Sequence, residues 1–151
     1  MKELILYSGF AGITVLLGGI LAYYFNHHIK KSPIKYEITH TMMSFGAGII
    51  LSALALVLIP KGMEELSLLP LAFSFLLGAI LFMIFDQYLA KKGGKVATLL
   101  AMIMDFIPES IALGAVFATD KKVATLLAVF IGLQNLPEAF NSFRDLIQSG
   151  Y

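Results

Sequence analysis

The sequence of 151 residues contains no cysteine, and only 14% of its residues are charged. The absence of cysteine excludes disulfide bonds, thiolate metal sites and cysteine nucleophiles. The charged fraction is well below the roughly 25% of an average soluble domain, so too few charged side chains are present to build a water-facing surface. The formal net charge is only +1 and no long basic run occurs, so we expect no nucleic-acid partner.

Long apolar runs take the place of the missing charges, since 58% of the residues are hydrophobic. A helix needs roughly 20 mostly apolar residues to cross a hydrocarbon layer about 30 Å thick. Runs of that length are too long for barrel strands, and backbone groups inside lipid must pair within their own element. Five runs meet the requirement: residues 4–25, 38–59, 68–89, 96–118 and 123–140. We therefore predict an all-α, polytopic transmembrane helix bundle with about five spans, in a single membrane domain of residues 1–151.

Lysines concentrate in two of the short polar breaks between these runs. The first break contains Lys30, Lys31 and Lys35, and the third contains Lys91, Lys92 and Lys95. The positive-inside rule assigns both breaks to the cytoplasm and the N-terminus to the outside. Lys121 and Lys122 in the fourth break oppose this assignment.

Small residues recur at helical spacing in the first two runs. They include Gly9, Gly12, Gly18 and Gly19 in the first run, and Ser44, Gly46, Gly48 and Ser52 in the second. Because helices in lipid associate through close backbone approach, we interpret these positions as sites of tight helix packing rather than as the lining of a pathway.

Two similar polar motifs interrupt the fourth and fifth runs. Asp105 stands four residues before Glu109, and Gln134 stands four residues before Glu138, with a proline directly before each glutamate. Residues four apart share a helix face, and Asn135, three before Glu138, joins the face of the second motif. Each proline also removes a backbone N–H and leaves one carbonyl without its usual partner. The motifs are therefore predicted to gather oxygen atoms at one depth.

Carboxyl groups at this depth require a neutralising partner. Placing a carboxylate at mid-bilayer costs about 2.5 to 3.5 kcal/mol on insertion scales. Neither run contains a lysine, arginine or histidine, which leaves protons or a bound cation. Carboxylate, amide and carbonyl oxygens suit hard or borderline cations, so a divalent metal is one candidate. The alternative is that protonated carboxyl groups hydrogen-bond to neighbouring helices and serve as packing elements.

The two motifs resemble those of the ZIP (Zrt/Irt-like) metal transporters, in particular the GufA-like branch of bacteria and archaea. The family's fourth span carries His-Asn-x-Pro-Glu-Gly, similar to residues 105–110, and its fifth span in this branch often carries Gln-Asp-x-Pro-Glu-Gly, similar to residues 134–139. Residues 44–60 are similar to the family's small-residue second helix. In this chain Asp105 stands in place of the histidine and Phe106 in place of the asparagine, and Ser110 and Ala139 replace the two glycines.

The resemblance implies uptake of a divalent cation of the zinc or iron class, with manganese and cadmium as further candidate substrates. It implies that the metal ligands are Asp105, Glu109, Gln134, Asn135 and Glu138. It also implies a prokaryotic inner (plasma) membrane, with the lipid bilayer and the metal ion as partners. Family members have eight spans and the likeness covers the first five, so we expect a truncated form, a homo-oligomer or a second polypeptide that supplies further spans.

Known enzyme signatures are missing from the sequence. There is no glycine-rich phosphate loop, zinc-protease helix motif or nucleophile elbow, so we expect no enzyme. Two other interpretations remain besides transport. One is a non-transporting structural or regulatory membrane subunit, and the other, with less support, is an intramembrane hydrolase that uses carboxylates on metal-bound water.

Overall fold

The computed structural model describes residues 2–29 and 32–148, without the side chains of residues 4, 94–96, 98, 99 and 148. The predictions made for Lys30, Lys31 and the side chain of Lys95 therefore lie outside the described residues. Nearly all of the described chain is helical, and no part of it forms a strand. The elements are α1 (Lys2–His28), α2 (Pro33–Ala53), the π-helical turn η1 (Leu54–Leu58), α3 (Ile59–Glu65), α4 (Leu68–Lys92), α5 (Gly94–Thr119) and α6 (Lys121–Gln148). The predicted all-α class is confirmed.

Five of the described helices are long and apolar enough to cross a membrane. The qualifying stretches are Ile5–His28, Pro33–Glu65, Leu68–Lys92, Leu100–Thr119 and Lys121–Ile147. The second of them joins α2, η1 and α3 into one continuous helix. The chain is therefore an integral membrane protein with a polytopic helical bundle, as its apolar runs predicted.

The second span ends later than predicted. The sequence placed its end at Ile59, where the apolar run gives way to a polar break, yet the helix continues through Pro60 to Glu65. A proline inside a helix lacks an N–H and its ring collides with the carbonyl four residues earlier. Here η1 lies directly before the proline, with the N–H of Ile59 bonded to the carbonyl of Leu54, and such a wide turn relieves the collision.

Lys61 supports the extension beyond the proline. Its Nζ lies 2.9 Å from Glu64 Oε2 and 3.3 Å from Glu65 Oε1, three and four residues further along. Such pairs lie on one helix face and stabilise an exposed turn modestly. The polar break thus shortens to Leu66 and Ser67.

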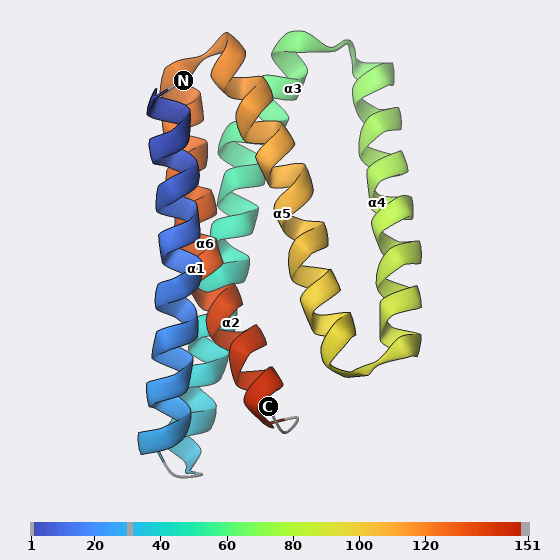
Figure 1. Cartoon of the computed structure of the whole chain (residues 1–151). Helices are drawn as coiled ribbons and strands as arrows, with labels where there is room; N and C mark the ends of the chain where they lie inside the picture. Colours follow the sequence, from blue (N-terminus) through green and yellow to red (C-terminus); the bar gives the residue numbers. More distant parts are fainter. Residues whose placement is uncertain (1, 30–31, 149–151) are drawn as a thin grey trace.

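Helix α6 is the central element, since it packs against α1, α2 and α5 (Figure 1). The N-terminus and the α3–α4 and α5–α6 connections lie at one end of the bundle (Figure 1). The α1–α2 and α4–α5 connections and the end of α6 lie at the other (Figure 1). Consecutive spans are therefore antiparallel, as their short connections require.

Small apolar side chains dominate the core around α6. The main cluster consists of Ala11, Ala53, Val57, Leu113, Val116, Ala124, Leu127, Ala128 and Ile131. A second cluster consists of Ala22, Phe25 and Phe140. It lies nearer the C-terminal end of α1 than the main cluster does. In contrast, α4 stands apart beside α5, and Leu89 is its only buried residue (Figure 1). Exposed apolar side chains on such a helix match the hydrocarbon of a bilayer, which is as apolar as leucine.

Two of the glycines singled out in the first two apolar runs bring helices into close contact. A Cβ built on Gly18 of α1 would collide with the carbonyl oxygen of Leu136 in α6, and one on Gly46 of α2 would lie 3.1 Å from Cγ of Pro137. At Gly9, Gly12 and Gly48 an added Cβ meets no described atom within 4 Å. The tight packing inferred from small residues therefore occurs at Gly18 and Gly46 but not at these other glycines.

Candidate functional site

The two proline motifs lie on continuous helices but in different surroundings. Pro108 lies inside α5 and is exposed, whereas Pro137 lies inside α6 and is almost completely buried. The polar residues before Pro137 are buried as well, with Gln134 6% and Asn135 4% exposed. The second motif therefore occupies the centre of the bundle, and the first faces it from the neighbouring helix.

A cavity of about 310 Å³ is lined by residues of α1, α5 and α6. Glu109 of α5 and both Asn135 and Glu138 of α6 line it. The remaining wall comes from Gly12, Val15 and Leu16 of α1 and from Met102, Ile103 and Phe106 of α5. A space of this size can hold several water molecules or a hydrated ion. Its lining is largely apolar, and Glu109, Asn135 and Glu138 are the polar residues in it.

Hydrogen bonds tie the polar side chains to their neighbours. Gln134 Nε2 donates to Oε1 of Glu109 and so connects the two motifs directly. Asn135 Nδ2 donates to the carbonyl oxygen of Ala11 in α1, at 3.3 Å. Because both amides donate through nitrogen, their oxygens are the atoms suited to ligate a hard cation.

The carboxyl groups of the site act on one another electrostatically. Glu109 is within electrostatic range of Glu138 and Asp105, and Glu138 is within range of Asp105. Among the described residues that line the cavity there is no lysine, arginine or histidine. The negative charges consequently repel one another unless a proton or a cation compensates them.

Four of the five predicted ligands come together, and the fifth does not. Glu109, Gln134, Asn135 and Glu138 meet at the cavity or one hydrogen bond from it. Asp105 is exposed, does not line the cavity and interacts electrostatically with Asp86 of α4. In the part of the chain that the structure describes, no group of three or more histidine, cysteine, aspartate or glutamate side chains is placed to hold a metal ion. A cation here would depend on two carboxylates together with amide oxygens.

The sequence did not point to the apolar walls of the cavity. On α5, Met102, Phe106 and Glu109 follow one another at spacings of four and three residues, so their shared face was detectable from the helical period. The contribution of Gly12 and Leu16 from α1 had no such signal, because it depends on which distant helix packs against α5 and α6.

Fold and site together define the class of this protein: a polytopic membrane protein with a carboxylate-bearing cavity between α1, α5 and α6. No protein-family model, curated protein or solved structure matches the chain significantly. Its function must therefore be argued from the chemistry of its own residues.

Proposed function

We propose that the protein transports a divalent metal cation across the membrane through the cavity between α1, α5 and α6. One observation carries the proposal: Glu109 and Glu138, on separate helices, line the same cavity together with Asn135. Two carboxylates facing one space inside a membrane are costly when uncompensated, and intramembrane ionisable groups usually mark ion pathways. A cation between the helices would satisfy the charges and the oxygen lone pairs at once.

Each polar residue has a role in this proposal. Glu109 and Glu138 supply the charged ligands, and the side-chain oxygens of Asn135 and Gln134 complete the coordination. Asp105 lies outside the cavity, one turn along α5, and would hold the ion on its way to or from it. Oxygen ligands of this kind accept zinc, iron, manganese or cadmium, and the resemblance to ZIP transporters favours zinc.

The proposal includes a direction and a location. With the N-terminus outside a prokaryotic plasma membrane, transport would run inward, as the likeness to ZIP proteins implies. Helix α4 exposes its apolar side chains, and these would be covered by lipid, by a second copy of the chain or by another polypeptide.

Zinc uptake into proteoliposomes that contain only this chain tests the proposal. We expect uptake by the wild-type protein, and loss of uptake to the level of protein-free liposomes in the Glu109→Gln, Glu138→Gln double variant. Glutamine keeps the size of the side chain but cannot provide the negative charge that attracts the cation. A matched control is Glu64→Gln with Glu65→Gln, which removes two carboxylates that pair with Lys61 at the end of the second span. If the two double variants lost zinc uptake to the same extent, a specific site at Glu109 and Glu138 would be contradicted.

The second candidate function is a structural or regulatory membrane subunit, and the hydrogen bond from Gln134 to Glu109 favours it. In that case protonated carboxyl groups hold α5 to α6, and glutamine would replace them with little effect. Thermal unfolding in detergent separates the two functions, because a ligand that binds only the folded state raises the unfolding temperature. Transport predicts that zinc raises this temperature in the wild type but not in the double variant. The structural function predicts no effect of zinc on either protein.

A further inference from the structure

A second, larger cavity lies at the end of the bundle where α1 ends, α2 begins and α6 ends (Figure 1). It has a volume of about 750 Å³, and all of its described lining residues except Met43 carry a polar group on the side chain. Its described lining residues include three potentially basic side chains, Lys35, His40 and Arg144, and no acidic one. We call it the basic cavity. It shares no lining residue with the carboxylate-bearing cavity, so it is a separate site.

Lys35 is held at the basic cavity by uncharged groups. Its Nζ donates to Oδ1 of Asn26 at 2.9 Å and to the carbonyl oxygen of Ile29 at 3.0 Å. It also lies 5.4 Å from the ring centre of Phe25, a cation–π distance. These contacts fix the ammonium group without neutralising its charge.

Arg144 brings a second cation to the same cavity from α6. Its side chain is only 17% exposed, and Nη2 lies 3.1 Å from Oδ1 of the adjacent Asp145. Its Nε is buried and has no hydrogen-bond partner among the described residues. The guanidinium group lines the cavity, and its planar fork matches the spacing of phosphate oxygens.

The start of α2 adds to the positive potential. Ser32 lines the cavity and caps this 21-residue helix, with its Oγ accepting the backbone N–H of Lys35 at 3.2 Å. The N-terminus of a helix carries a partial positive charge that favours anions. Two cationic side chains, of which Arg144 is paired with Asp145 outside the lining, thus converge on one cavity with a helix N-terminus.

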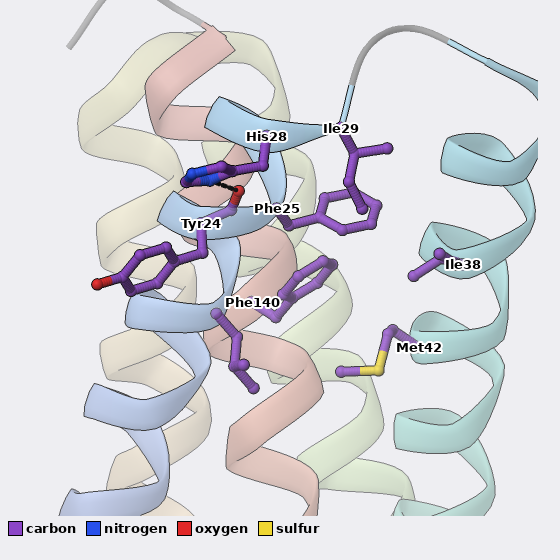
Figure 2. A pocket seen from close by; sticks show the side chains of 8 residues that line it. Tyr24, Phe25, His28, Ile29, Ile38, Met42 and Phe140 are labelled. Carbon is purple, nitrogen blue, oxygen red and sulfur yellow. Dashed lines mark hydrogen bonds between the residues drawn. The ribbon is translucent and has the colours of Figure 1, made fainter.

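An apolar groove of about 510 Å³ is lined in part by Phe25, the residue whose ring lies near Lys35 Nζ. Figure 2 shows Phe25 of α1 and Phe140 of α6 on the side that faces Ile38 and Met42 of α2. The rings of Phe25 and Phe140 meet edge to face at a centroid distance of 5.1 Å. A cationic cavity close to an apolar groove at the end of membrane spans matches the two parts of a phospholipid.

We propose that the basic cavity binds the phosphate of an anionic phospholipid, with Lys35 and Arg144 contacting its oxygens. The site concerns the lipid environment and is independent of the proposed metal transport. Free inorganic phosphate offers the same oxygens, but it would gain nothing from the apolar groove.

Native mass spectrometry of the purified full chain tests the proposal with phosphatidylglycerol, which is anionic, and phosphatidylcholine, which is zwitterionic. We expect the wild type to retain phosphatidylglycerol preferentially. Lys35→Gln with Arg144→Gln should weaken this binding about 30-fold, from roughly 1 kcal/mol per basic residue. The matched control is Lys91→Gln with Lys92→Gln, which removes two charges at the same end of the bundle but outside the cavity (Figure 1).

The control double variant should retain the preference for phosphatidylglycerol. If both double variants lost this preference equally, general surface charge rather than the basic cavity would explain the binding, and the proposal would be overturned. Lys35 also supports the α1–α2 connection, so Arg144→Lys provides a test that does not depend on it. This variant keeps the charge but lacks the guanidinium fork, and we expect a partial loss of phosphatidylglycerol. Inorganic phosphate that binds as tightly as the lipid and displaces it would overturn the assignment to a phospholipid.

Discussion

Asp120 directly precedes α6, and its side chain accepts hydrogen bonds from backbone groups of the first turn. Its Oδ1 accepts the N–H of Lys122 at 2.9 Å and of Val123 at 3.1 Å. The bond from Val123, and after it the bond from Lys122, holds the pKa of the Asp120 carboxyl below its ordinary value of 3.8, with a smaller contribution from the charge of Lys61. The charged form is therefore the one that the folded helix prefers.

Acid should weaken this cap. Because the pKa is lower in the folded state than in the unfolded one, the stabilisation is fully present above pH 3.8 and is lost as the pH falls through the lowered value. We expect Asp120→Ala to lower the unfolding temperature in detergent at neutral pH, since two backbone donors lose their acceptor. Asp120→Asn should keep most of the cap and lose the acid dependence that Asp120 contributes. If the Asp120→Asn variant kept the full acid dependence of the wild type, the carboxylate of Asp120 would not be the acid-sensitive cap of α6.

The polar motifs show which site residues a sequence can predict. Glu109 and Glu138 were identified from their depth in apolar runs, and both line the cavity. Asp105 was expected beside them because it shares a face with Glu109, yet four residues advance about 6 Å along a helix and turn about 40° beyond a full circle. That offset places Asp105 off the cavity wall, toward α4. The helical period therefore predicts a face but not where along that face a cavity ends.

At the scale of helices, Gly18 sets how closely α1 approaches α6. A Cβ at this position would lie 2.9 Å from Cβ of Ala139 and 3.1 Å from the backbone nitrogen of Phe140, besides the collision with the carbonyl of Leu136. Backbone atoms cannot rotate away, so the helices would have to separate. We expect Gly18→Ala to destabilise the fold by about 1 to 3 kcal/mol, as overpacking usually does. Unfolding in mixed micelles with increasing dodecyl sulfate measures the change.

Gly9→Ala is the control on the same helix. An added Cβ at Gly9 has no described neighbour within 4 Å, and alanine favours helix over glycine by up to about 1 kcal/mol. Gly9→Ala should therefore be neutral or slightly stabilising. Similar destabilisation by both substitutions would mean that glycine itself, rather than the contact with α6, sets stability at these positions.

The ends of the spans show where sequence patterns stop being informative. Apolar runs located all five helices, because length and hydropathy are local properties. The second run was ended too early, because its apolar residues stop before Pro60, whereas the helix continues past the proline to Glu65. A single wide turn does not change the apolar pattern, so no periodicity could have predicted it. The separation of α4 from the bundle was equally hidden, because α4 is as apolar as its neighbours.

At the scale of the molecule, the two ends of the bundle differ in charge. One end carries both signs, and Lys121 there lies 3.4 Å from Glu3 beside the N-terminus. The other end contains Lys35, Lys91, Lys92 and Arg144, and most of the lysine and arginine residues belong to it by their place in the sequence. The positive-inside rule then assigns this end to the cytoplasm, where the leaflet also holds most of the anionic lipid. The contact of the basic cavity with the leaflet rich in anionic lipid depends on this orientation, and so does the proposed inward direction of transport.

Cysteine labelling in cells tests the orientation directly, because the chain has no cysteine of its own and each introduced thiol is unique. Ser67, between α3 and α4, and Lys92, at the end of α4, are both exposed and lie at opposite ends of the bundle (Figure 1). We expect a membrane-impermeant maleimide to label the Ser67→Cys variant in intact cells and the Lys92→Cys variant only after permeabilisation. The reverse pattern would place the basic cavity at the outer leaflet. It would also mean that a cation taken up from the end with the N-terminus moves outward, so transport and lipid binding would both need a new account.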